Sequence, residues 1–424
     1  MKNKITGVII ILFIAVSFAA AGAEEILTWQ DCLKESAKNN PDLIAAGEQV
    51  KQSVASKNAT GSALFPQVNS SASAGKSSTR DPGSDSAVSD SYSYGVTASQ
   101  LIFDGGKTVN NLRAAKETVN ASKQNFRFTS STVRYNLRSA FIDLLRVQEM
   151  MRITQEIYDI RRGNLELIAL RYASGLEHKG ALMTAEADVA SAQYGISQVA
   201  RQLQVAQRRL ANAMGRKDPS PIAASGDFEV KENTKDKPEL EKIAKDHPSL
   251  KQAAAQKSSA RFGLNSAYAN FAPVLSAGTG VGKTGSAWTP RGDQWNFGVG
   301  LSLPIFEGGL RLAQVAQAQA QLKQLEANEI STKDSVLLTL EQAWALLQDA
   351  VDFAQVQKKS LDANQERSRI SQAQYSIGFI SFDNWTIIED NLVSAKRTFL
   401  DAEAAALYAE AAWIQAKGET LEYE

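Results

Sequence analysis

The chain has 424 residues, of which 43% are hydrophobic and 22% are charged, and this composition excludes bulk disorder. Lys plus Arg and Asp plus Glu both number 46, so no global charge favours nucleic acid or a strongly acidic partner. We therefore expect a folded protein that binds no nucleic acid and whose selectivity depends on local charge.

The first residues have the pattern of a secretory signal peptide, which we place at residues 1–23. Lys2 and Lys4 precede an apolar run over residues 8–18, and residues 21–23 form a small-residue cleavage site. The apolar run is well short of the roughly 20 residues that a spanning helix needs. Because no later segment is apolar for long enough either, the protein must use strands if it crosses a membrane.

Short motifs recur at a nearly constant distance and indicate an internal duplication. The distance is 203 residues for two of the motifs (306 − 103 = 203) and 207 for a third (247 − 40 = 207). The pairs are Phe103-Asp104-Gly105-Gly106 with Phe306-Glu307-Gly308-Gly309, Arg171-Tyr172-Ala173-Ser174-Gly175 with Gln374-Tyr375-Ser376-Ile377-Gly378, and Asn40-Pro41-Asp42-Leu43 with His247-Pro248-Ser249-Leu250. We predict a first repeat over 24–215, a linker over 216–237, a second repeat over 238–418 and a C-terminal tail over 419–424.

Each repeat contains a predicted β-hairpin, at about 66–103 and about 273–306. In the second hairpin, Trp295, Phe297 and Val299 alternate with small or polar residues, a length and pattern that suit a transmembrane strand of about 9 to 11 residues. A soluble sheet packed on helices remains the alternative, although the small residues opposite favour a pore wall. Closed membrane barrels start at about 8 strands, so one chain with four strands needs partners; two or three copies both fit.

Long helices are expected after each hairpin, because residues 83–218 and 305–424 contain no proline. Gly175 and Gly378 divide these stretches into long arms, 107–172 and 310–375, and return arms, 179–214 and 382–417. The seam of the second long arm follows heptad spacing, with Ile330, Leu337, Leu340, Trp344, Leu347, Val351 and Ala354. The return arms are about half as long as the long arms, so we expect amphipathic segments at about 28–62 and 239–269 to stack on their ends.

The order and duplication of these motifs resemble the TolC-like outer-membrane efflux protein family over nearly the whole mature chain. The resemblance implies a mainly α fold with transmembrane β-strands, in which a homotrimer forms a 12-stranded barrel on an α-helical tunnel. It further implies a passive exit duct of an efflux or type I secretion system. Such a duct lies in the outer membrane of a Gram-negative bacterium with a long periplasmic extension. Its expected partners are the lipid membrane, a periplasmic adaptor (membrane fusion) protein and an inner-membrane RND or ABC transporter.

The resemblance also suggests site residues. It places the periplasmic tip and the docking of the adaptor at Arg171, Tyr172, Gly175, Glu177, Lys179, Tyr375, Gly378 and Phe379. Family members often carry acidic residues shortly after the second turn. Here the nearest acid is Asp383, beside the uncharged Asn384, which departs from that pattern; we place both residues at the tunnel entrance. From the residues themselves, Gly105, Gly106, Gly308 and Gly309 are expected to bend each strand into its helix, because glycine permits the backbone angles that such a bend requires.

Several patterns argue against enzymatic or cofactor chemistry. His178 and His247 are the only histidines and lie in different repeats, so no histidine metal cluster is expected. Residues 277–284 satisfy a permissive phosphate-loop pattern, but Pro290 and two glycines follow where a helix would have to begin. We expect no catalysis and no cofactor; the alternative function is a periplasmic coiled-coil adaptor or scaffold without a pore.

Overall fold

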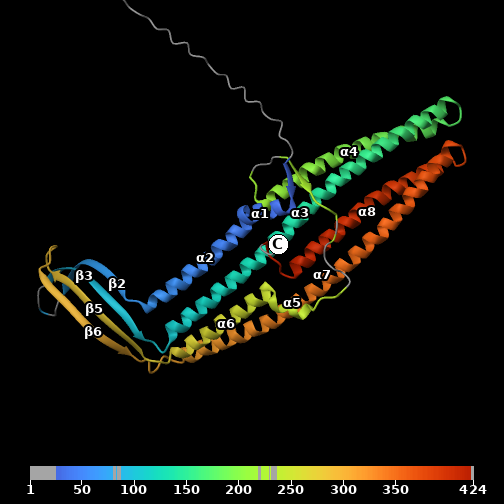
Figure 1. Ribbon diagram of the computed structural model, residues 1–424. Coiled ribbons are helices and arrows are strands. Elements are labelled where there is room, and N and C mark those ends of the chain that lie inside the picture. Colours follow the sequence, from blue (N-terminus) through green and yellow to red (C-terminus); the bar gives the residue numbers. More distant parts are fainter. Residues whose placement is uncertain are drawn as a thin grey trace, which may run out of the picture.

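The computed structural model describes residues 25–79, 83, 87–217, 221–228, 230 and 236–421. The predicted signal peptide lies outside the described residues, as do parts of the predicted linker and of the tail. The molecule is elongated: a β-sheet occupies one end, and long helices run from it to a pair of tight turns at the other end (Figure 1).

Two β-hairpins form one antiparallel sheet. The strands β2 (Gln67–Thr79), β3 (Ala87–Phe103), β5 (Val274–Gly285) and β6 (Gly292–Ser302) lie in the order β2-β3-β5-β6. The pairing of β3 with β5 joins the hairpins of the two repeats. Therefore β2 and β6 are the two edges of the sheet, and each edge strand lacks a neighbour on one side.

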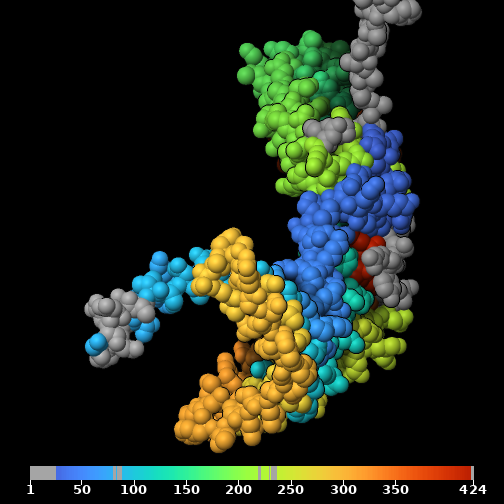
Figure 2. All heavy atoms as spheres, turned by 90° about the vertical axis from the view of Figure 1, so that its left-hand side faces the viewer, coloured from blue at the N-terminus to red at the C-terminus, as the bar shows by residue number. Residues whose placement is uncertain are grey.

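The two faces of this sheet differ in chemistry. In register across the strands, Trp295 pairs with Val281, and Val281 pairs with Val96 on the apolar face. The opposite face carries glycine, serine, threonine, asparagine and glutamine. Trp295 is 78% exposed and Phe297 is 71% exposed, and Figure 2 shows the sheet as a curved wall hollowed on one side. The alternative of a soluble sheet packed on helices is therefore wrong for this fold, because no helix of the described chain covers the apolar face.

Four long helices cross the molecule: α3 (Lys107–Ala173), α4 (Lys179–Met214), α7 (Leu310–Ser376) and α8 (Phe382–Ala416). Near the sheet, the short helices α2 (Pro41–Gly61) and α6 (Pro248–Ala269) take the places of α4 and α8. The contacts give a layer four helices wide, in the order α2, α3, α6, α7 near the sheet and α4, α3, α8, α7 near the turns. Among the described residues, no helix has both the length and the apolar character needed to cross a membrane.

Short elements surround the middle of this layer. Apart from η1 (Ser62–Leu64), which joins α2 to β2 at the sheet, they are β1 (Glu25–Thr28), α1 (Trp29–Asn39), β4 (Ile222–Ser225) and α5 (Leu240–Asp246), with β1 and β4 paired in parallel. The largest buried apolar cluster lies here and includes Leu137, Phe141, Leu210 and Met214. A second cluster packs Trp344 of α7 edge-on against Trp413 of α8, with ring centroids 5.2 Å apart. The core thus sits midway between the sheet and the turns.

The segments predicted at 28–62 and 239–269 each form two helices rather than one. The break precedes Pro41 in the first repeat and Pro248 in the second, and each proline is the first helical residue. A proline forces the preceding residue out of the helical region, and Asn40 and His247 have ψ angles of 123° and 132°. Each then serves as the N-cap of the following helix through a side-chain acceptor.

Each short helix stacks on the end of a return arm, as the segment lengths predict. Asn40 Nδ2 donates to the carbonyl of Ala213, 2.9 Å away, near the end of α4. Gly215 ends α4 with φ 80°, and a Cβ there would collide with the carbonyl oxygen of Asn39. In the second repeat Gly418, with φ 76°, lies in the same way against Pro248. Glycine therefore allows a close approach at both joints, to the backbone of Asn39 at Gly215 and to the ring of Pro248 at Gly418.

The second joint is expected to weaken in acid. His247 is 6% exposed, its Nδ1 accepts from Ser249 N at 3.2 Å, and burial lowers the pKa of its imidazole. Stability is therefore fully present above about pH 6.5 and is lost as pH falls through the lowered folded-state pKa. Losing the cap costs about 1 kcal/mol. The protection of the amides at the start of α6, measured as their exchange rate relative to that of an unfolded chain at the same pH, should decrease between pH 7.5 and pH 5.

The first repeat supplies the control, because Asn40 occupies the position of His247. His247→Asn keeps a cap acceptor that does not titrate in this range, so amide protection at the start of α6 should become as insensitive to pH as protection at the start of α2. The charges nearest to His247 are an Asp246–Lys251 ion pair of 2.8 Å, with Arg127 and Lys242 in electrostatic reach of Asp246. An unchanged acid response in His247→Asn would show that His247 is not its source, because the ion pair lowers the pKa of Asp246 and does not titrate in this range.

Candidate functional site at the closed end of the helical hairpins

The two turns at the far end of the helices share one geometry. Gly175 and Gly378 have φ of 72° and 79°, the left-handed conformation that ends a helix. Beyond them, Leu176 N donates to Arg171 O at 2.9 Å and Phe379 N donates to Gln374 O at 2.8 Å. His178 and Ser381 then cap α4 and α8 with their side chains. The repeated sequence thus forms the same tight turn twice.

Tyr375 joins the two turns and is the centre of the site. Its side chain is 1% exposed and stacks on Trp385 of α8, with ring centroids 4.3 Å apart and planes 12° apart. The guanidinium of Arg171 lies over the tyrosine ring, 4.9 Å from its centroid. The hydroxyl donates to Glu177 Oε2 at 2.9 Å. We call Arg171, Glu177, Tyr375 and Trp385 the aromatic latch.

The latch connects one hairpin to the other. Arg171 and Glu177 belong to the α3–α4 hairpin, whereas Tyr375 and Trp385 belong to the α7–α8 hairpin. Burial raises the pKa of Tyr375 to about 12, and the hydrogen bond to Glu177 acts in the same direction, so the hydroxyl remains a donor at physiological pH. Moving the hairpins apart would break the hydrogen bond and the cation–π contact together.

Exposed apolar side chains form a rim around the same turns. Leu170 and Leu176 are 66% and 67% exposed, and Ile377 and Phe379 are 80% and 75% exposed. Large apolar groups gathered at one end of a molecule are typical of an interaction surface. Tyr172, Gly175, Lys179 and Gly378 are also exposed here.

The structure separates the predicted tip residues into two groups. Tyr172, Gly175, Lys179, Gly378 and Phe379 are exposed and available to a partner, whereas Tyr375 is buried. The docking role of Tyr375 stays a prediction; in this conformation its ring lies between Trp385 of its own hairpin and Arg171 of the other. Arg171 and Glu177 point inward with it.

The two predicted entrance residues lie in the first turn of α8. Asp383 and Asn384 are both exposed, and Asn384 N donates to the capping Ser381 Oγ at 3.4 Å. A carboxylate suits this position because the N-terminal end of a helix is positive. The side chains of Asp383 and Asn384 remain free to face other groups at the tip.

The four junction glycines lie at the opposite end of the long helices (Figure 1). Gly105, Gly106, Gly308 and Gly309 have φ between 59° and 87°, which glycine adopts without strain. Asp104 accepts from Gly106 N at 3.1 Å and from Thr108 N at 2.8 Å, and so caps α3. These glycines turn a strand into a helix and make no contact with the tip.

The sequence reasoning missed Trp385 and its neighbours. Trp385 and Phe382 form a buried cluster with Tyr375 and with Ile168 and Ala181 of the other hairpin. The spacing of Phe382 and Trp385 by three residues, directly after a capping serine, is the signal of a buried face at a helix start that could have found them.

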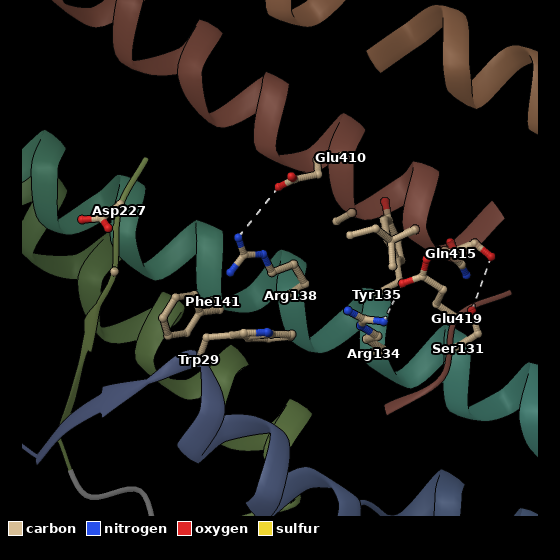
Figure 3. Close-up of a pocket in the computed structure, with 13 residues that line it drawn as sticks. Trp29, Ser131, Arg134, Tyr135, Arg138, Phe141, Asp227, Glu410, Gln415 and Glu419 are labelled. Atoms are coloured by element: carbon tan, nitrogen blue, oxygen red, sulfur yellow. Dashed lines mark hydrogen bonds and ion pairs between the residues drawn. The ribbon is translucent and has the colours of Figure 1, made fainter. Parts of the chain in front are cut away.

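A cavity of ≈350 Å³ lies midway along the molecule (Figure 3). Arg138 lies over the ring of Trp29, 5.0 Å from its centroid, and 4.0 Å from Glu410. Arg134 forms a 3.1 Å ion pair with Glu419. Each of these cations has a carboxylate partner, so the arrangement ties α3 to α8 and to the residues after it. Among the described residues no cluster of His, Cys, Asp and Glu side chains is arranged to hold a metal ion.

Comparisons with known proteins bear on the whole chain. The family model "Outer membrane efflux protein" matches residues 32–216 and 240–419. The pyoverdine export outer membrane protein OpmQ of Pseudomonas aeruginosa is 26% identical over 420 residues, which cover 94% of this chain and 84% of OpmQ. The outer membrane efflux protein BepC of Brucella suis is 24% identical over 426 residues, or 95% of this chain and 84% of BepC.

Solved structures share the fold. The crystal structure of a membrane protein from Pseudomonas aeruginosa superimposes with a TM-score of 0.81 at 18% identity, covering 91% of this chain and 92% of the other. Since the sequence identity is low, this likeness establishes the architecture alone.

Proposed function

Because the chain belongs to the family of outer membrane efflux proteins, we propose that three copies of it form the passive exit duct of a multicomponent efflux system. The protein is an efflux channel of the outer membrane of a Gram-negative bacterium and not an enzyme. The single observation that carries the proposal of a duct that closes at the turns is the aromatic latch. It joins two hairpins at the end of a helical layer, where a duct has to close.

The trimer is supported by open edges that match. The sheet ends at β2 and β6, and the helical layer ends at α2 and α4 on one side and at α7 on the other. On α7 the apolar Leu346, Phe353 and Val356 are 50% to 61% exposed. A head-to-tail contact of one edge with the other closes a ring. Three chains of four strands give 3 × 4 = 12 strands, which leaves no edge unpaired in lipid.

The partners follow from the rim and from the passive nature of a duct. We propose that a periplasmic adaptor protein docks on the exposed apolar rim around Leu176 and Phe379. An inner-membrane RND or ABC transporter would then supply the energy. The names of OpmQ and BepC describe export and efflux. An exposed end on which a partner protein docks suits a channel with such a use.

The test of the proposal is the conductance of the purified protein in a planar bilayer, together with its assembly state. We expect a trimer after chemical crosslinking of membranes and discrete channel openings in the bilayer. A matched control is Leu346→Glu, which places a carboxylate on the exposed face of α7 and should abolish the trimer and the openings together. A monomer without conductance would support the scaffold alternative.

The entrance residues give a separate prediction. If Asp383 and Asn384 of three chains line the narrow end, Asp383→Ala removes three charges and should reduce the preference for cations over anions several-fold. Reversal potentials in a salt gradient measure this preference. Asn384→Ala, which removes no charge, is the control. Equal selectivity in the wild-type protein and in Asp383→Ala would place the constriction elsewhere.

A further inference from the structure

Charged side chains from three helices meet on the inner side of the aromatic latch. Arg161 of α3 lies 3.6 Å from Asp188 of α4 and forms a second ion pair with Asp390 of α8. The guanidinium side chain is 11% exposed. Arg161 precedes Arg171 by ten residues (171 − 161 = 10), which places it about 15 Å further along the helix. A single cation therefore ties the two hairpins at this level.

A buried donor without a protein acceptor lies beside this ion pair. The indole of Trp385 is 1% exposed, and its Nε1 finds no hydrogen-bond acceptor among the described residues. Leaving such a group unpaired costs about 1 to 3 kcal/mol, and buried polar groups in folded proteins almost always have a partner. Glu389, one turn further along α8, is 6% exposed and accepts from Ser368 Oγ at 2.6 Å through Oε1.

Trp385, Glu389 and Arg161 line one small cavity, together with Asn164 and Asp188. Its volume is ≈10 Å³, about what the centre of one water molecule needs. A buried water is stable where two to four polar partners surround it, and this lining supplies a donor, two carboxylates and an amide. Burial raises the pKa of Asp188 against the pull of Arg161, and its side chain is 34% exposed, so this carboxylate is only partly solvated.

We propose that the cavity binds one water molecule, which accepts a hydrogen bond from Trp385 Nε1 and donates to the carboxylates of Glu389 and Asp188. The site joins α4 to α8 through the water, directly behind the ring on which Tyr375 stacks. It is thus a second tie between the hairpins, and it orients Trp385 for the latch. Only its consequence for closing the duct depends on the proposed function.

The test replaces Trp385 in the full-length protein by 3-benzothienylalanine, which keeps the bicyclic shape but has sulfur in place of the indole N–H. If the water is bound, the analogue loses a satisfied hydrogen bond. Amide exchange over residues 382–390 should then become roughly fivefold faster. If Nε1 has no acceptor, removing the N–H relieves a buried unpaired group, and exchange stays equal or slows; that result would overturn the proposal.

Two further measurements complete the test. The same analogue at Trp413, which packs on Trp344 far from the tip, should leave exchange over 382–390 unchanged. An experimental map at high resolution should show one density peak within hydrogen-bond distance of Trp385 Nε1 and Glu389, and a dry cavity would contradict the proposal. Amide exchange does not require ion conduction. If the protein conducts no ions, the proposed duct is refuted, and the exchange measurement still decides whether the water is bound.

Discussion

We expect Gly105→Ala to abolish assembly, whereas Gly308→Ala, the equivalent substitution in the second repeat, should leave most of it intact. Both glycines lie in the left-handed region, with φ of 68° and 59°, where a Cβ costs about 1 to 2 kcal/mol. At Gly105 a Cβ would also collide with Ala272 Cβ and lie 3.1 Å from Ala269 O, whereas at Gly308 nothing lies within 4 Å. Overpacking of this kind adds about 1 to 3 kcal/mol.

The yield of folded, protease-resistant trimer in membranes measures this difference. A second variant keeps the explanation testable, because Gly105→Ala combined with Ala272→Gly removes the colliding atom. We expect the double variant to recover most of the way to the level of Gly308→Ala, which retains only the backbone strain, because the tight contact of the new Cβ with Ala269 O remains. If the double variant fails as completely as the single one, the contact with residue 272 is not the cause.

We expect Tyr375→Ala to open the end of the proposed duct at the turns and to make the channel leaky. The substitution removes a buried ring stacked between Trp385 and Arg171 and the hydrogen bond to Glu177. Truncation of a buried aromatic residue costs about 3 kcal/mol or more. If this cost falls on the closed arrangement, the ratio of closed to open molecules decreases about a hundredfold. Single-channel conductance and the sensitivity of cells to large antibiotics measure the change.

Two other tyrosine substitutions separate the parts of the latch. Tyr375→Phe keeps the stacked ring and loses only the hydrogen bond to Glu177. We therefore expect a smaller leak, with the ratio of closed to open molecules decreasing about tenfold. Tyr172→Ala is the control, since Tyr172 occupies the equivalent position in the first repeat (375 − 203 = 172) and is 40% exposed. A leak in Tyr172→Ala as large as in Tyr375→Ala would mean that the turns, and not the latch, hold the end closed.

The lengths of the long helices were predicted closely from the sequence. The predicted arms 107–172 and 310–375 end within one residue of α3 and α7, because the absence of proline and the position of glycine act locally. The short helices were predicted less well, since the proline breaks at Asn40 and His247 divide each segment in two. The heptad seam was correct for Leu340, Trp344 and Leu347, which are buried.

Ile330 shows where the seam prediction failed. It follows the heptad spacing, yet it is 64% exposed in the single chain. Periodicity identifies an apolar stripe but not which neighbour covers it, and α7 lies at the edge of the helical layer. The same limit applies to Trp385, whose burial depends on contacts with Ile168 and Ala181 of the other hairpin.

The sequence by itself determined what the two repeats have in common. Each motif fixes a local conformation through glycine at positive φ, a capping side chain or the absence of proline, and these effects act within a few residues. The tertiary structure alone decided how the repeats differ. Gly105 touches another segment and Gly308 does not, and Tyr375 is buried while Tyr172 is exposed. Such differences arise because the hairpins pack side by side, and residues far apart in the chain then meet at only one of two locally identical places.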